Sequence, residues 1–275
     1  MLNIVKIKWD TYSLGSIGDV NLGEEQGIKR RVPLIDELRG FAIICMVFYH
    51  GAYDLVVLYG YNIPIFETDF MDALSTAFAM LFVVISGTAC RYSRNNYKRG
   101  VICFTAGMII TLITYFATPD DFIRFGILHM LGISMIVFSL IGRFLDKISP
   151  AWGIALMTFL TVITYNIPSR YIGVTGLVEI GLPNVLYNSG FLFPFGFIGY
   201  GFVSSDYFPL FPWVFIFLAG SYFGVYLKGN KLPEGFYKGR SRPLAFVGRH
   251  TMIIYLLHQP LILGLITMIR YLSGA

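Results

Sequence analysis

Seven stretches of the sequence are long and apolar enough to cross a lipid bilayer, and this pattern limits the fold more than any other feature. Crossing the hydrocarbon core takes a helix of about 20 mostly apolar residues. Only 13% of the residues are charged, against about 25% in soluble domains, so lipid must cover most of the surface. We therefore predict an all-α polytopic bundle of about seven spans in residues 31–275, preceded by a polar tail at residues 1–30. The predicted spans are 38–59, 70–90, 100–118, 126–144, 150–167, 209–228 and 244–271.

The Lys and Arg residues are distributed unevenly, and this bias predicts the orientation. If the N-terminus is cytoplasmic, the stretch up to Arg39 and the segments 91–99, 143–149 and 228–249 hold 18 of the 21 Lys and Arg residues. We therefore expect a multi-pass protein of the plasma membrane with a cytoplasmic N-terminus. The net charge of +5 then reflects topology and contact with anionic lipids, not binding to nucleic acid.

An aromatic and glycine-rich stretch breaks the pattern of spans. Its apolar part, residues 191–203, contains Pro194 and several glycines and is short for a crossing of the membrane. A crossing here would also move the basic loop 228–242 to the outer side, against the charge bias. We expect a re-entrant or interfacial segment around residues 185–208, serving as an outer lid or cavity wall.

The first apolar stretch carries three ionisable residues, Arg39, His50 and Asp54. An ionisable group at membrane depth is costly unless paired or hydrated, so each is a functional candidate. Helical geometry places Arg39 and His50 on one stripe, with His50 roughly 16 Å deeper. Asp54 follows one turn later, close enough to hydrogen-bond His50 and fix its tautomer. The alternative is structural: Arg39 reaches lipid phosphates and His50 bonds a neighbouring helix.

Two further groups of polar residues stand out. Arg91, Arg94 and Arg99 lie in a basic patch that suits a polyphosphate ligand, although the orientation bias explains the patch equally well. His129 and His258 fall in later spans, where each either lines a cavity with His50 or simply packs helices together.

The three cysteines, Cys45, Cys90 and Cys103, follow no ligand spacing. We expect no metal site.

Four blocks of the sequence resemble one family. The block at 31–50, RVPLIDELRGFAIICMVFYH, closely resembles the opening of bacterial proteins related to heparan-alpha-glucosaminide N-acetyltransferase, which are transmembrane acyltransferases. The spacing of Arg39 and His50 also resembles the Arg-x10-His motif of the acyltransferase-3 family. The other blocks are FGILH at 125–129, DYFPLFPW at 206–213 and GRHTMIIYLLHQP at 248–260.

The resemblance implies transfer of an acetyl or short acyl group from cytoplasmic acetyl-CoA, or another acyl-CoA, to a sugar or amino sugar on the outer side. His50 and Arg39 match the motif residues, so His50, Asp54 and Arg39 are the expected catalytic residues, with His50 as base or nucleophile. The CoA phosphates are expected near Arg39, Arg91, Arg94 and Arg99. The acceptor is expected at His129, His258, Tyr255 and Asp206. The chain has fewer spans than the human lysosomal enzyme and lacks its large luminal domain, which leaves the acceptor open.

A different class of function fits the same residues. In a proton-coupled transporter of small molecules or lipids, His50 and Asp54 would form a proton relay. Many transporters contain two matched halves, and no internal repeat of that kind is visible here. Small residues in the second and third spans leave a homodimer open.

Overall fold

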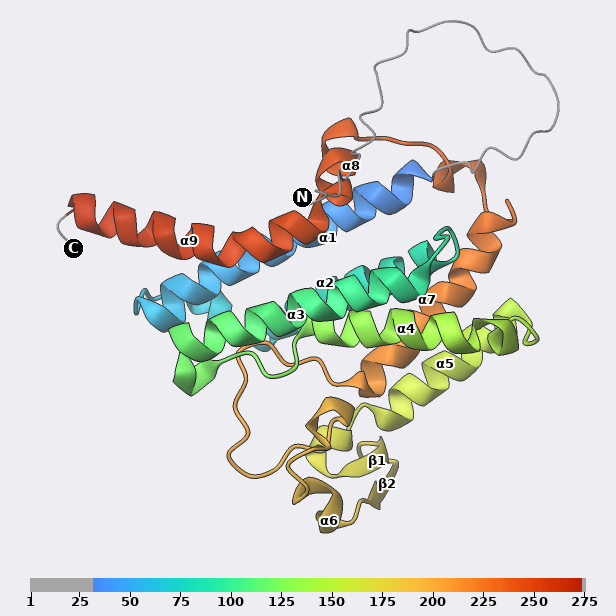
Figure 1. The fold of residues 1–275 in the computed structure, drawn as a ribbon, viewed down its shortest axis with the longest axis horizontal. Coiled ribbons are helices and arrows are strands. Elements are labelled where there is room, and N and C mark those ends of the chain that lie inside the picture. Colours follow the sequence, from blue (N-terminus) through green and yellow to red (C-terminus); the bar gives the residue numbers. More distant parts are fainter. Residues whose placement is uncertain (1–31, 274–275) are drawn as a thin grey trace, which may run out of the picture. The chain divides into compact units, whose positions relative to one another are not determined.

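The computed structural model describes residues 32–273, and most of them are helical (Figure 1). Seven helices in this range are long and apolar enough to cross a membrane. The prediction of an all-α polytopic bundle is confirmed; the tail at residues 1–30 lies outside the described residues. The seven are α1 (Pro33–Tyr53, continued by the π-helical η1, Asp54–Leu58), α2 (Asp69–Cys90), α3 (Asn96–Ala117), α4 (Ile127–Leu145), α5 (Pro150–Thr164, continued to Ser169 by the 3-10 turn η4, Ile167–Ser169), α7 (Leu210–Lys228) and α9 (Thr251–Ser273).

The last predicted span, residues 244–271, differs from the structure. The chain forms two helices here, the short α8 (Arg242–Arg249) and the long α9, separated at His250. The α8 helix is fixed from its first turn, since the Ser241 hydroxyl accepts a hydrogen bond from the Leu244 N–H at 3.4 Å. The Glu37 carboxylate of α1 accepts two more, from the backbone N–H groups of Arg240 at 2.6 Å and Ser241 at 2.8 Å.

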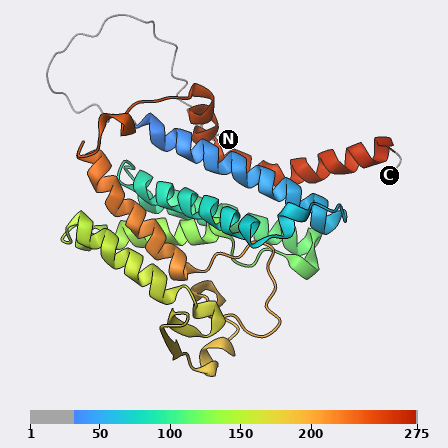
Figure 2. The ribbon, with the colours of Figure 1, turned by 180° about the vertical axis from the view of Figure 1, so that it is seen from behind.

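Glycines allow helices to approach each other closely. A Cβ added at Gly248 of α8 would collide with the backbone carbonyl of Asp36 in α1, and one added at Gly40 would collide with that of Leu244. The backbones of α1 and α8 therefore touch directly, as small residues permit in membrane proteins. Figure 2 shows α8 beside the beginning of α1.

A non-spanning segment connects α5 to α7. It contains an antiparallel hairpin of β1 (Tyr171–Val174) and β2 (Val178–Gly181), in which Tyr171 pairs with Gly181. The short α6 (Asn184–Tyr187) and the 3-10 turn η5 (Phe193–Phe195) complete it. None of these elements is long enough to span the bilayer. The segment ends beside the start of α4, where the Phe208 N–H donates to the Phe125 carbonyl at 2.9 Å.

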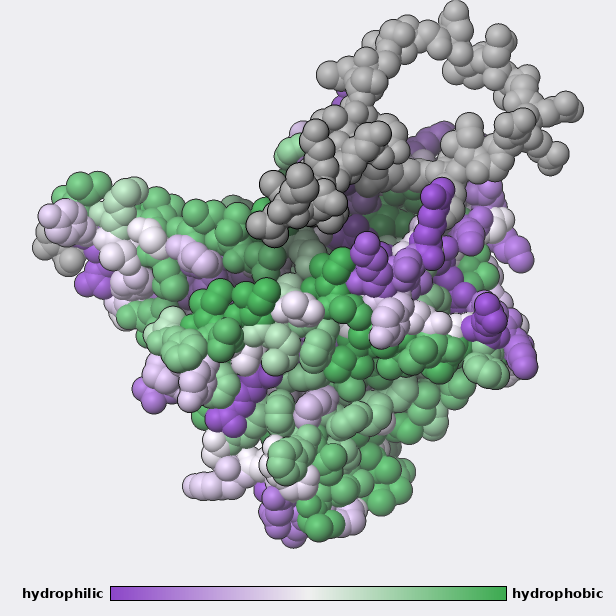
Figure 3. Space-filling model, in the orientation of Figure 1, coloured by the Kyte–Doolittle hydropathy of each residue, from purple (hydrophilic) through white to green (hydrophobic). Residues whose placement is uncertain are grey.

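The loops that were predicted to be cytoplasmic lie at one end of the bundle. Arg91, after α2, forms an ion pair with Asp146, after α4. Glu37, near the start of α1, holds the loop that follows α7. Hydrophilic side chains gather at this end in Figure 3, while apolar side chains cover the helices beside it. Which side of the membrane this end faces remains the prediction made from the charge bias.

The glycine contact gives a test of the fold. We expect Gly248→Ala to lower stability by about 1–3 kcal/mol, because the added methyl group forces two backbones apart. Gly264→Ala in α9 is the matched control, since no atom lies within 4 Å of a Cβ there. Thermal unfolding in detergent measures both variants, and equal melting temperatures would contradict the close α1–α8 contact.

Candidate active site

A cavity of about 230 Å³ opens among α1, α2, α9, the starts of α4 and α7, and the loop before α7. Its walls are mostly apolar, with polar side chains from α1, α2, α9 and that loop. These polar side chains are Tyr49, His50, Ser75, Thr76, Ser205, Asp206, Tyr207 and Tyr255. Three predicted site residues that are distant in sequence, His50, Asp206 and Tyr255, therefore line one cavity.

His50 faces a second histidine across the α1–α9 contact. The ring centres of His50 and His258 lie 5.0 Å apart. The Nδ1 atom of His258 lies 2.6 Å from the Tyr255 carbonyl oxygen, which only accepts, so this nitrogen carries a proton. In the neutral ring Nε2 then keeps its lone pair. The structure thus sets beside His50 a second imidazole whose tautomer is fixed.

Asp206 joins three parts of the chain at the wall of the cavity. Its Oδ2 atom accepts from the Ile127 N–H at 3.1 Å and from the Tyr255 hydroxyl at 3.0 Å. The first of these donors is at the N-terminus of α4, where a helix favours a negative charge. Desolvation by burial nevertheless raises the pKa of Asp206 above its ordinary value, and the hydrogen bonds and nearby His258 offset this only in part.

Asp54 has a different partner from the expected one. Both of its carboxylate oxygens accept from the Gln259 Nε2 atom, at 2.8 and 3.0 Å, and no hydrogen bond to His50 occurs between these described residues. The reason is that His50 and Asp54 both face α9, so each meets the α9 residue opposite it. His50 with His258 and Asp54 with Gln259 form two successive pairs between the first and last spans.

His129 lies outside the lining of the cavity. Its Nδ1 atom accepts from the Gly126 N–H at 3.1 Å, so the neutral ring carries its proton on Nε2, 3.3 Å from the Thr111 hydroxyl. Both ring nitrogens are therefore used inside the protein, and the side chain is only 2% exposed. This arrangement favours a structural role, in which His129 holds the α4 N-terminus that faces Asp206.

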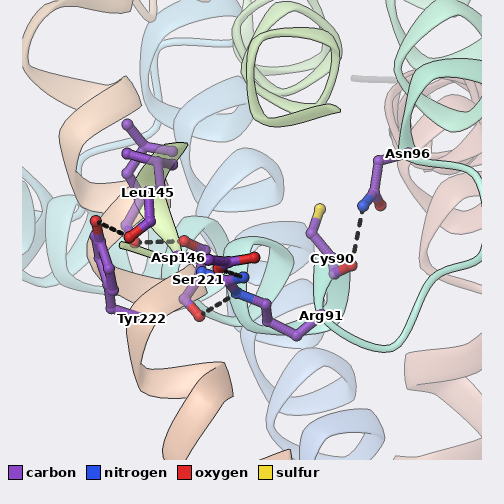
Figure 4. A network of polar contacts seen from close by, with 8 residues as sticks. Cys90, Arg91, Asn96, Leu145, Asp146, Ser221 and Tyr222 are labelled. Carbon is purple, nitrogen blue, oxygen red and sulfur yellow. Dashed lines mark hydrogen bonds and ion pairs between the residues drawn. The ribbon is translucent and has the colours of Figure 1, made fainter. Parts of the chain in front are cut away.

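The predicted phosphate-binding arginines fall into two kinds. Arg91 is nine-tenths buried and held in place (Figure 4). Its Nε–H donates to the Ser221 carbonyl at 3.0 Å, and the guanidinium pairs with Asp146 and covers the Phe138 ring. Arg94 and Arg99 are exposed at the same end of the bundle.

Arg39, the fourth arginine, lies at this end as well, 3.7 Å from the Asp36 carboxylate.

Several members of the site were not predicted from the sequence. Tyr49 and Trp213 line the cavity, and Gln259 pairs with Asp54. Gln259 carried a signal that could have found it, since an amide inside an apolar span needs a partner. Tyr49 and Trp213 fall inside the blocks at 31–50 and 206–213 that resemble the family, and this was the signal that could have found them. Among the described residues, no group of three or more His, Cys, Asp or Glu side chains forms a metal site.

Comparison with known families shows which family the chain belongs to. A family described as "Heparan-alpha-glucosaminide N-acetyltransferase, catalytic" matches residues 31–260. The chain belongs to this family. The match runs from the start of α1 to Pro260 in α9, and all residues that line the cavity fall within it. No curated protein and no solved structure matches the chain.

Membership of the heparan-alpha-glucosaminide N-acetyltransferase family indicates the class of reaction. The family is one of acetyltransferases, so this chain is classed with transferases that sit in a membrane. The matched region also contains Arg39, Arg94 and Arg99, at the opposite end of α1 from Asp54. The α1 helix thus carries Arg39 near its basic end and His50 at the cavity.

The raised pKa of Asp206 gives a second test. A carboxyl group with a higher pKa in the folded protein holds its proton more tightly there, so stability falls as the pH rises through that pKa. We expect Asp206→Asn to remove this penalty and to melt at a higher temperature than the parent protein at neutral pH. The difference should shrink as the pH is lowered toward the ordinary pKa of aspartate.

The control for this test is Asp69→Asn, at an exposed carboxylate. A lower melting temperature for Asp206→Asn at neutral pH would show that the hydrogen bonds of Asp206 outweigh its desolvation.

Proposed function

We propose that the protein is a membrane acetyltransferase that moves an acetyl group from acetyl-CoA to an amine or hydroxyl group of a sugar. The observation that carries this proposal is the cavity that brings His50, Asp206 and Tyr255 together in a chain of the heparan-alpha-glucosaminide N-acetyltransferase family. The donor binds at the cytoplasmic end, and the acceptor reaches the cavity from the outer side of the plasma membrane.

His50 acts as the general base in this proposal. The acceptor nitrogen or oxygen attacks the thioester carbonyl carbon while His50 takes its proton. The C–S bond then breaks, and the CoA thiolate leaves with that proton as free thiol. The ring centre of His258 lies 5.0 Å from that of His50. Because its Nδ1 carries the proton, the neutral His258 ring keeps a lone pair on Nε2. It is therefore positioned to share the proton during turnover.

Asp206 and Tyr255 bind the acceptor in this proposal. Both line the cavity, and the Tyr255 hydroxyl is oriented by its hydrogen bond to Asp206. A carboxylate and a hydroxyl together suit a polyhydroxylated ring, and a carboxylate suits the ammonium group of an amino sugar. The aromatic walls at Tyr49 and Trp213 suit the apolar face of the same ring.

The CoA phosphates bind at the basic end of the bundle in this proposal. Arg94 and Arg99 are exposed there, and Arg39 is on α1, which also carries His50. Arg91 contributes differently, because Ser221, Asp146 and Phe138 already hold its guanidinium. We assign phosphate contacts to Arg39, Arg94 and Arg99, and a scaffold role to Arg91.

Removal of the base tests the mechanism. We expect His50→Ala to slow thiol release from acetyl-CoA by about 100-fold or more in the presence of an amino-sugar acceptor. The fold should survive, because the His50 ring is only partly buried. His250→Ala is the matched control, since that histidine is exposed and only hydrogen-bonded to the Phe246 carbonyl. Near-normal turnover by His50→Ala would remove the proposed base.

Rapid denaturation of the parent protein at neutral pH distinguishes direct transfer from an acyl-histidine intermediate. With radiolabelled acetyl-CoA and no acceptor, we expect no label on the protein that hydroxylamine removes. Label that disappears in the His50→Ala protein would contradict the direct route.

The two kinds of arginine also predict different outcomes. We expect Arg99→Ala to raise the KM for acetyl-CoA about tenfold with little change in melting temperature, because one charge-assisted phosphate contact is lost. Arg91→Ala should instead lower the melting temperature, since Asp146 and the Ser221 carbonyl lose their partner. Lys231→Ala, on the exposed loop after α7, is the control. An unchanged KM in Arg99→Ala would contradict the assignment of this residue to the donor.

A further inference from the structure

The segment between α5 and α7 is poorly suited to water. Residues 165–209 contain only three charged side chains, Arg170, Glu179 and Asp206. Asp206 lines the cavity, which leaves two charges for the surface of a 45-residue stretch. Soluble domains have about 25% charged residues. A surface with so few charged side chains is more stable in contact with an apolar partner, such as lipid or another protein surface, than in water.

Large apolar side chains nevertheless point outward from this segment. Leu177, at the tip of the hairpin, is 81% exposed, and Phe191 is 88% exposed. Val178 and Ile180 of β2 and Val185 of α6 are also more than half exposed. Soluble monomers rarely display so many neighbouring apolar side chains unless the patch binds something.

The position of the segment indicates what it binds. In Figures 1 and 2 the hairpin lies beside the bundle, and the far ends of α1 and α3 extend past it. Along the length of α1 and α3 it therefore stays within the reach of the spanning helices, and it lies to one side of them. The β1 strand packs on the end of α5, whose Phe159, Val162 and Tyr165 are exposed in the same way. Figure 3 shows the apolar surface continuing from the helices onto this part of the chain.

The backbone of the segment fits the interfacial layer of the membrane better than its hydrocarbon core. The hairpin is paired along its length, and the Leu182 N–H donates to the Arg170 carbonyl at 2.9 Å. Turns and an open strand edge are still present, and these need water or headgroups as partners. Arg170 stacks on the Tyr187 ring and donates to Asn184 at 3.2 Å, which keeps its charge within the segment.

We propose that residues 171–191 bind the lipid leaflet on their side of the membrane. Leu177, Val178, Ile180 and Phe191 insert among the headgroups and the upper acyl chains, as apolar and aromatic residues do in interfacial elements. Because the same segment supplies Asp206, the wall of the reaction cavity is attached to an element that rests in lipid. This proposal does not depend on the identity of the reaction.

Spin-label accessibility in liposomes tests the proposal. Single cysteines at Leu177→Cys and Phe191→Cys, in a protein whose native cysteines are replaced by alanine, carry a nitroxide in phosphatidylcholine vesicles. Val162→Cys, on the exposed side of α5, is the lipid-facing control, and Lys231→Cys, on the loop after α7, is the water-facing control. We expect both test sites to be relaxed more by oxygen than by a water-soluble nickel chelate, as at Val162.

Two results would overturn the proposal. One is nickel accessibility at residues 177 and 191 equal to that at Lys231. The other is spin–spin broadening that disappears when unlabelled protein is added, because it would mean that a second copy of the chain covers the patch.

A second measurement leaves the native cysteines in place. Leu177→Trp should add a fluorescence component that brominated phosphatidylcholine quenches, and a component that resists this quenching would contradict lipid contact.

Discussion

A polar group inside the bilayer is costly unless it finds a partner in the protein or in water, because lipid offers none. This constraint determines which helices meet. Asp54 is completely buried and is hydrogen-bonded by Gln259, and His50 faces His258. Both pairs join α1 to α9, so the first and last spans are fixed in register by their polar residues. Apolar packing alone would leave that register weakly specified, since lipid tails are as apolar as leucine.

The same constraint explains how an irregular segment comes to form the wall of the cavity. The Asp206 carboxylate meets the N-terminus of α4 and the Tyr255 hydroxyl of α9. These contacts bring the loop before α7 between two spans that are otherwise far apart in the chain. The elevated pKa of Asp206 shows that burial of the carboxylate is only partly offset by its partners. Groups held at such a cost are often found at functional sites.

The sequence was sufficient to predict the spans, because hydrophobic length is a direct consequence of bilayer thickness. The family resemblance also predicted site roles for His50, Asp206 and Tyr255, and it is the structure that brings these three residues to one cavity. The predicted partner of Asp54, His50, was wrong. Helical spacing allows a contact between residues four apart but says nothing about a neighbouring helix, and Gln259 is 205 residues away.

The last span shows a similar limit of sequence reasoning. Residues 244–271 read as one apolar stretch, yet α8 and α9 separate at His250. The α8 helix packs directly on the α1 backbone at Gly248, and a hydropathy pattern contains no information about such a contact. Arg91 illustrates the point again, since the charge was visible in the sequence but its burial against Phe138 and Ser221 was not.

The pairing of His50 with His258 has a consequence for biogenesis. These residues lie on the first and last spans of the bundle, so the ribosome must deliver almost the whole chain before the two imidazoles can meet. Membrane helices are inserted from the N-terminus onward as synthesis proceeds. A partly synthesised chain therefore already carries His50 in the bilayer but has no completed cavity around it. The cavity, which includes Tyr255 of α9, and the contact between the two imidazoles are therefore completed only after the last span has been made.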